Sequence, residues 1–179
     1  MMEIVITTSQ LAGHSELQGI KSFVTSKGSY TEENMDYFIT LDASVALAKD
    51  GEVIVGVAIS ISLDDHPSLT SNRLFMKYIE GSAFKMNELL TPITYVDEGY
   101  TGRRIASKLA LARCQFSLNK GYKAQVNFGY STREILAYTW TIDGNLDTGA
   151  VDHAGDPILI RTLEDTIKSI VAKGVTLTQ

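Results

Sequence analysis

The hydrophobic and polar positions of the N-terminal part change period along the chain, and each change marks an expected element. Residues 3–7 are mostly apolar and β-branched, which predicts a strand. Between Ser15 and Lys27 the apolar residues recur every three or four positions, which predicts a helix that Gly28 ends. A second helix is expected from Thr31 to Ile39, with acidic side chains in its first turn, where the helix dipole favours them.

A β-hairpin is expected next. Segments 44–49 and 53–63 are strand-like, and the Asp50-Gly51 pair between them is typical of a tight turn. The pattern then breaks from Asp64 to Lys85, where we expect a long excursion with a short helix around residues 74–79. Long connections of this kind in a compact domain are often functional.

The middle of the chain predicts strand, turn, helix and strand. Segment 88–96 is expected to be a strand that Pro92 interrupts with a bulge or a splayed edge, because proline cannot donate a ladder hydrogen bond. An apolar stripe predicts a helix from Gly102 to Asn119, which Gly121 ends, and a strand over 123–128 follows it.

The last third completes the pattern. Ser131 and Glu134 form a capping box that predicts a helix to about Ile142. A core strand is expected over 157–162 and a terminal helix over 163–173. This order predicts an α/β fold with a mixed sheet and helices on both faces, and simple alternation of strands and helices does not describe it.

Composition narrows the class of protein. A chain of 179 residues with 44% hydrophobic residues is long enough for one domain with a real core, so we expect a single domain over 1–179. No apolar run reaches the length of a membrane span, and no basic segment precedes an apolar one at the start. Cys114 is the only cysteine, which excludes an internal disulfide and suits a cytoplasmic protein. The net charge of −5 argues against a nucleic-acid partner.

A glycine-containing turn opens the clearest helix. The segment from Asp97 to Ala106 joins a strand directly to the helix start, where unpaired backbone N–H groups and the positive end of the dipole favour a phosphate. The turn is neither a P-loop nor a dinucleotide fingerprint, since it has too few glycines.

The segment Tyr95-Val-Asp-Glu-Gly-Tyr-Thr-Gly-Arg-Arg-Ile-Ala106 resembles the acyl-CoA pyrophosphate loop of the GNAT superfamily of N-acetyltransferases. The resemblance implies a GNAT-like fold, in which a mostly antiparallel sheet is splayed at its middle strands. It also implies that the last strand residues pair with the pantetheine arm and that the loop holds the phosphates of acetyl-CoA. The implied pantetheine contacts are Tyr95, Val96 and Asp97, and the implied phosphate contacts are Thr101, Gly102, Arg103, Arg104, Ile105 and Ala106.

Two positions depart from the GNAT pattern. Thr101 stands where Arg or Gln is usual, and Arg104 stands where the middle glycine is usual. The Arg104 side chain is expected either to crowd the pyrophosphate or to swing outward and pair with a phosphate.

Two further matches concern catalysis. The stretch from Ser131 to Tyr138 resembles the family's next helix, in which Ser131 caps the helix and Tyr138 protonates the departing CoA thiolate. Glu88 precedes Gly102 by a spacing that resembles the histone-acetylating branch, where a glutamate deprotonates the acceptor amine directly or through water. The other interpretation of Glu88 is a carboxylate at a strand end that faces solvent.

These matches imply an N-acyltransferase that passes an acetyl or other acyl group from acyl-CoA to an amine by direct attack in a ternary complex, without a metal. Segment 64–85 is expected to cover the acceptor site, and a homodimer would follow family habit. The main alternative is a non-catalytic GNAT-like module that binds CoA, a nucleotide or a protein. Acylation of a nucleic-acid base, supported only by the Arg103/Arg104/Lys108 cluster, and an unrelated interaction protein are further alternatives.

Other candidate groups are interpreted as structural. Asp64-Asp65-His66 is expected to be a solvated turn rather than a metal site, because three adjacent residues do not converge easily on one ion. His14 and His153 are expected at the surface, and Cys114 is expected to be a structural residue of its helix.

Overall fold

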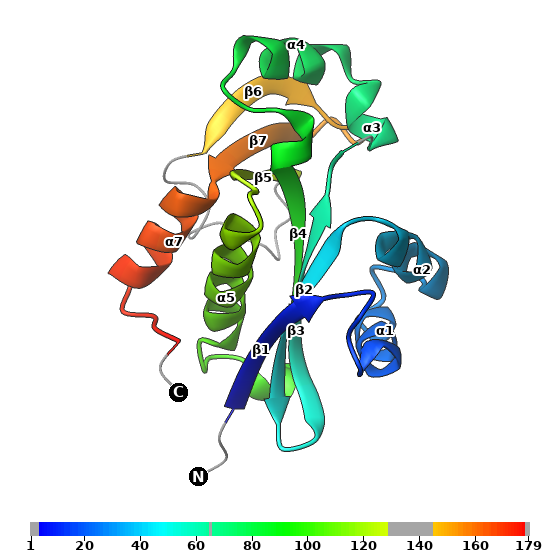
Figure 1. Ribbon diagram of the computed structural model, residues 1–179, viewed down its shortest axis with the longest axis vertical. Helices are drawn as coiled ribbons and strands as arrows, with labels where there is room; N and C mark the ends of the chain where they lie inside the picture. The colour runs from blue at the N-terminus through cyan, green and yellow to red at the C-terminus, as the bar shows by residue number, and fades with distance from the viewer. Residues whose placement is uncertain (1–3, 65, 129–144, 178–179) are drawn as a thin grey trace.

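A seven-stranded sheet in the order β1-β2-β3-β4-β5-β7-β6 forms the centre of the computed structural model (Figure 1). The structure describes residues 4–64, 66–128 and 145–177. All neighbouring strands are antiparallel except β4 and β5, which are parallel. The fold class predicted from the sequence, a mixed and mostly antiparallel sheet with helices on both faces, is confirmed.

The elements of the N-terminal half are β1 (Ile4–Gln10), α1 (Leu17–Ser26), α2 (Glu32–Thr40), β2 (Ala43–Asp50), β3 (Val53–Ser62), α3 (Pro67–Thr70) and α4 (Arg73–Gly81). Those of the C-terminal half are η1 (Met86–Glu88), β4 (Leu89–Val96), η2 (Glu98–Tyr100), α5 (Ile105–Asn119), β5 (Ala124–Phe128), β6 (Leu146–Val151), β7 (Pro157–Thr162) and α7 (Leu163–Ala172).

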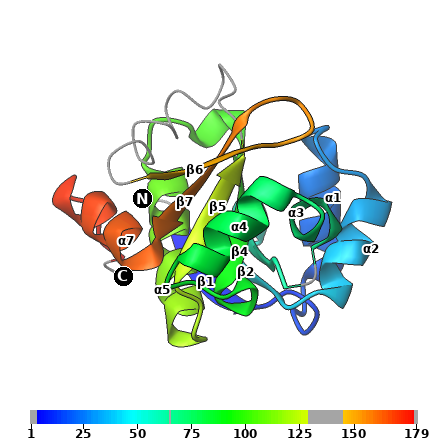
Figure 2. The same cartoon turned by 90° about the horizontal axis from the view of Figure 1, so that it is seen from above.

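The two faces of the sheet carry different helices (Figures 1 and 2). Helices α1 and α2 pack on one face, over alternate residues of the first strands such as Val45, Leu47 and Ile59. Helix α5 packs on the opposite face over the intervening residues, including Ala46 and Ala58, and α7 lies beside it. This alternation is the period of two that buries both faces of the central strands.

The sheet opens between β4 and β5. Only Leu89 and Leu90 pair with β5, opposite Ala124 and Gln125, whereas β4 continues alongside β3 as far as Val96. Pro92 gives the physical reason, because the next ladder bond from this edge would need an N–H that proline lacks. Of the two alternatives that Pro92 predicts, a bulge or a splayed edge, the structure shows the splayed edge. The β3–β4 register runs through Pro92 without a shift.

Two expectations differ from the structure in detail. The excursion after β3 holds two helices, α3 and α4, where one was expected. Glu88 ends the short 3-10 turn η1 and does not lie on the strand.

Candidate functional site

The outer edge of β4 carries backbone groups beyond the splay that pair with no other strand in the described part of the chain. Asp97 donates its N–H to the Val55 carbonyl of β3, and ladder groups alternate in direction along a strand. The N–H and C=O groups of Thr94 and Val96 therefore point away from β3, toward the diverging β5. Thr94 is exposed, as a residue on an open edge should be. This edge offers two donors to a ligand that lies between the strands.

The turn after β4 and the start of α5 meet this edge. Gly102 has a φ of 77° and Arg104, the N-cap of α5, a φ of 59°. No side chain of residues 4–64, 66–128 or 145–177 caps the helix, so no capping residue in these ranges uses its first-turn N–H groups. The exposed residues Thr101 to Arg104 leave this end of α5 open to solvent.

Arg104 is the one non-glycine residue with a positive φ among residues 4–64, 66–128 and 145–177. Its side chain turns toward the C-terminal end of α7, where Nη1 donates to the carbonyls of Lys173 and Gly174 at 3.3 and 3.4 Å. The guanidinium thus neutralises part of the negative end of the α7 dipole. Of the two alternatives expected for Arg104, the side chain swings outward, and the groups that it contacts are the carbonyls at the C-terminal end of α7.

Asp97 fixes the shape of the turn. Its carboxylate accepts the Gly99 N–H at 3.1 Å and pairs with Lys27 of the α1 end at 3.4 Å. The backbone N–H of Gly99, and then Lys27, hold the pKa of Asp97 below its ordinary value. Tyr100 donates to Asp50 at 2.8 Å, and this bond raises the pKa of the Tyr100 hydroxyl. The turn is thereby tied to both the α1 layer and the β2–β3 hairpin.

The side chains of Tyr95 and Val96 pack into the core on opposite faces of the sheet. Tyr95 lies against the α1–α2 core and meets Tyr30 edge to face at 6.5 Å, and Val96 packs under α5. Only backbone atoms of Val96 are therefore directed to the open edge. The structure brings the predicted residues from Tyr95 to Ala106 together at one corner, with β4, the turn and the α5 start in sequence.

Glu88 lies at the other end of β4. Its carboxylate pairs with Lys123 at 2.6 Å and accepts the Lys85 N–H at 3.0 Å. The bond from Lys123, followed by that from Lys85, lowers the pKa of Glu88, which makes the carboxylate a weaker base. Tyr138 and Ser131, the predicted acid and helix cap, lie outside the described residues.

A buried guanidinium lies beside the splay and was not anticipated. Arg113 of α5 is 3% exposed and donates to Ser60 at 3.2 Å and Gln125 at 2.8 Å. Ser60 stands opposite Pro92 in the register, so the cation lies where β4 and β5 part. No ion pair of Arg113 occurs among the described residues, and its neutral partners carry the contact. Burial raises the pKa of the neighbouring Cys114 thiol, as expected for a structural cysteine.

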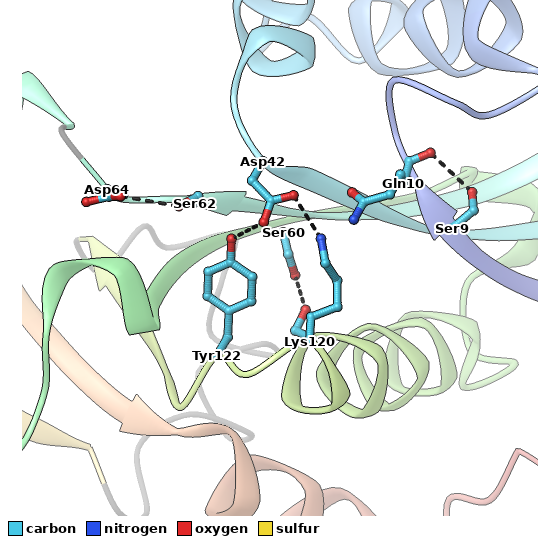
Figure 3. Close-up of polar contacts among 9 residues, drawn as sticks. Ser9, Gln10, Asp42, Ser60, Ser62, Asp64, Lys120 and Tyr122 are labelled. Carbon is cyan, nitrogen blue, oxygen red and sulfur yellow. Dashed lines mark hydrogen bonds and ion pairs between the residues drawn. The ribbon is translucent and has the colours of Figure 1, made fainter.

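Asp42 joins the first half of the sheet to the end of α5 (Figure 3). It accepts the Tyr122 hydroxyl at 2.6 Å and pairs with Lys120 at 2.8 Å. Burial raises the pKa of Asp42, but the bonds from Lys120 and Tyr122 outweigh it and hold that pKa below its ordinary value. Burial and the Asp42 carboxylate raise the pKa of Tyr122 to about 12.

The position of His66 differs from the solvated turn that the sequence predicts for residues 64–66. The expected solvated turn is half-buried at this residue, and His66 Nδ1 is enclosed and has no hydrogen-bond partner among the residues that the structure describes. Burial lowers the pKa of His66, so its imidazole is neutral at pH 7. Within the described ranges, no group of three or more acidic, histidine or cysteine side chains is arranged to hold a metal ion.

Sequence comparisons find no match, either to a family model or to a curated protein. Solved structures do match. A CoA complex of the GNAT family N-acetyltransferase YhbS from Escherichia coli aligns with a TM-score of 0.58 at 15% identity, covering 93% of this chain and 86% of that chain. The chain has the GNAT fold.

Two other structures with the GNAT fold align over nearly their whole length. FeeM, an N-acyl amino acid synthase from uncultured soil microbes, aligns with a TM-score of 0.65 at 14% identity, over 98% of this chain and 100% of that chain. YncA of Salmonella typhimurium, described with its cofactor acetyl-CoA, gives 0.56 at 11% identity, over 90% of this chain and 94% of that chain. In the part of the present chain that the structure describes, no helix combines the length and apolar character of a membrane span.

Proposed function

We propose that this chain is an N-acyltransferase, acting as a single domain over residues 1–179, that transfers an acetyl or other acyl group from acyl-CoA to an amine. The open edge of β4, which lies next to the uncapped start of α5, carries this proposal. The edge offers N–H donors to the pantetheine arm, and the helix start offers N–H groups to the pyrophosphate. Solved structures of the same fold hold CoA or acetyl-CoA, which supports this choice of donor.

The proposed steps of acyl transfer follow from the direction of the backbone N–H groups on the open edge of β4. The thioester carbonyl would accept the Thr94 N–H, which stabilises the oxyanion as the amine attacks. Attack forms the C–N bond, and collapse of the tetrahedral intermediate then breaks the C–S bond. The CoA thiolate would take a proton from Tyr138, the acid that the sequence pattern suggests. Direct transfer of this kind needs donor and acceptor bound at the same time.

The base is the part of the sequence prediction that receives least support. Glu88 is held by Lys123 and Lys85, and its lowered pKa reduces its tendency to take a proton from an ammonium group. Glu88 stays a prediction, which the activity of Glu88→Gln will test.

A non-catalytic CoA-binding module is the second candidate, and Arg104 is the observation that favours it. Arginine occupies the position at which the GNAT pattern has a glycine, and its backbone adopts a glycine-like φ of 59°. Binding without transfer to any amine would select this candidate.

Calorimetric titration with acetyl-CoA, with CoA and ATP as comparisons, tests the proposal. We expect micromolar binding of acetyl-CoA that weakens in Gly102→Val, because a β-branched residue is strained at a φ of 77° and the turn must change shape. Gly13→Val is the matched control, since a Cβ at Gly13 meets nothing within 4 Å and lies far from the turn in sequence. Failure of every CoA compound to bind at millimolar concentration would refute the proposal.

A further inference from the structure

A cavity lies on the side of β5 away from α5. It has a volume of about 480 Å³ and lies between helix α3, the end of β5 and the turn that joins β6 to β7. Asn72, after α3, donates to the Val151 carbonyl at 2.8 Å and so fixes α3 against the β6 end. Its lining includes His66, Leu69, Phe128, Asp152, His153 and Ile158.

Phe128, which lines the cavity, ends β5 beyond the last residue that pairs with β4. Leu90 of β4 pairs with Gln125 of β5, and the two strands run in the same direction. Ile93 and Phe128 each follow these residues by three positions, so they lie at the same level along the strands, on opposite sides of the opening. The next β4 residue is Thr94, whose N–H points toward β5. The thioester carbonyl would lie at the Thr94 N–H, and an acceptor bound against Phe128 would approach it from the side of β5.

The lining combines an apolar floor with a weakly acidic rim. Leu69 and Ile158 are buried, and Phe128 is half-buried. The charged or titratable groups that share the cavity with His66 are Asp152 and His153, both from the β6–β7 turn. Asp152 Oδ1 accepts the N–H groups of Ala154 and Asp156 at 2.8 and 3.0 Å, which fixes its carboxylate. The described lining has no lysine or arginine.

This lining favours one class of acceptor. A carboxylate such as Asp152 attracts an ammonium group, and the apolar floor accepts a hydrocarbon substituent. A free α-carboxylate on the acceptor would have no cationic partner among the described lining residues, so its desolvation would be uncompensated. The chemistry fits a primary amine with an apolar group better than the corresponding amino acid.

We propose that this cavity binds the acceptor amine and that His66 is the general base of acyl transfer. His66 Nδ1 is enclosed, so Nε2 is the nitrogen left to face the cavity. Nε2 takes a proton from the acceptor ammonium, and the freed lone pair attacks the thioester carbon. The C–N bond forms, the C–S bond breaks, and the thiolate takes a proton from the acid of the site. The amide nitrogen then gives its remaining extra proton to that acid, which restores the acid. The proposal rests on the proposed acyltransferase function.

His66 is suited to this role because its imidazole is already neutral at pH 7. A neutral imidazole accepts a proton, whereas Glu88 is stabilised as the anion by Lys123. With His66 as base, kcat/KM should fall as the pH drops through the lowered pKa of His66, below the ordinary value of 6.5.

The test uses acetyl-CoA with phenethylamine and phenylalanine, which differ by one carboxylate. We expect kcat/KM to be at least about tenfold higher for phenethylamine, since the described lining offers no cationic partner to the carboxylate of phenylalanine. His66→Gln should lower kcat by more than about tenfold and remove the acidic limb of the pH profile, while acetyl-CoA affinity is unchanged. His14→Gln, outside the cavity, is the matched control and should change neither.

Binding gives a second readout that does not depend on turnover. The chain has 3 histidines, so single substitutions assign each imidazole signal in a carbon-13 NMR spectrum. Phenethylamine should shift the signals of His66 and His153 and leave that of His14 in place. Ser68→Trp, at an exposed position of the lining, should raise the KM for phenethylamine without removing the fold, which covers the case that His66→Gln fails to fold.

The outcomes separate the two proposals. If the wild-type chain binds no acetyl-CoA, the proposed function fails. If acetyl-CoA binds but phenethylamine neither shifts His66 nor is acylated, or if His66→Gln keeps the full rate and the acidic limb, this inference is overturned. A preference for phenylalanine would overturn the assignment of the acceptor class.

Discussion

Gly56 of β3 sets how closely helix α5 lies on the sheet, and Gly56→Ala tests this packing. A Cβ at residue 56 would lie 2.8 Å from Leu109 Cδ1, 3.3 Å from Ile105 Cγ2 and 3.4 Å from the Tyr95 carbonyl. Leu109 is fully buried, so its side chain must leave its rotamer or α5 must move outward. Overpacking of this kind costs about 1–3 kcal/mol. For a domain of this size, the cost lowers Tm by about 2–12 °C.

Calorimetric unfolding of Gly56→Ala measures this cost, and Gly13→Ala is the control, because a Cβ there meets nothing within 4 Å. A double-mutant cycle with Leu109→Ala gives the sharper result. Leu109→Ala alone should cost about 2–5 kcal/mol. The double variant should cost less than the sum, because the new methyl group enters the space that Leu109 vacates. Additive losses, or a Gly56→Ala protein as stable as the wild type, would refute the packing argument.

Three other variants test the parts around the site. Arg104→Gly relieves a positive φ, which is worth about 1 kcal/mol, but it also removes the bonds to the carbonyls at the end of α7, so the free energy of unfolding should change little. Calorimetry should show tighter binding of acetyl-CoA. Weaker binding would make the arginine a phosphate ligand. Tyr122→Phe should lower the free energy of unfolding by about 1 kcal/mol at pH 7, and this deficit should shrink as acid protonates Asp42. A carboxylate with a lowered pKa stabilises the fold above its ordinary pKa of 3.8 and loses this effect as the pH falls through the folded value. A deficit that persists at pH 2 in urea titrations argues against the bond. Glu88→Gln should change kcat by less than about threefold, because a carboxyl with an ordinary pKa of 4.5, lowered further by Lys123, is a weak base at neutral pH. A loss of a hundredfold in a thiol-release assay would restore Glu88 as the base.

The features that the sequence predicts correctly are local ones. Pro92 lacks an N–H wherever it stands, so it predicts the end of the β4–β5 ladder without knowledge of β5. The start of α5 follows from the glycine turn and the apolar stripe behind it. These two features place the candidate CoA site.

The features that the sequence does not predict depend on distant partners. Arg113 lies in a helix where an isolated arginine is ordinarily exposed, and its burial requires Ser60 and Gln125 from two strands far apart in the chain. His66 is enclosed because helix α3 faces the β6–β7 turn, a contact that no local pattern encodes. The outward course of the Arg104 side chain depends in the same way on the end of α7.

The central claim is that acyl-CoA lies along the open edge of β4, and amide hydrogen exchange with and without saturating acetyl-CoA tests it most directly. Thr94 and Val96 point their N–H groups into the opening, whereas Ile93 and Tyr95 point theirs toward β3. The account predicts that exchange slows by at least about tenfold at Thr94 and Val96, as expected for amides that gain hydrogen-bond partners, and changes little at Ile93 and Tyr95. Unchanged exchange at Thr94 and Val96 in a protein saturated with acetyl-CoA would contradict it.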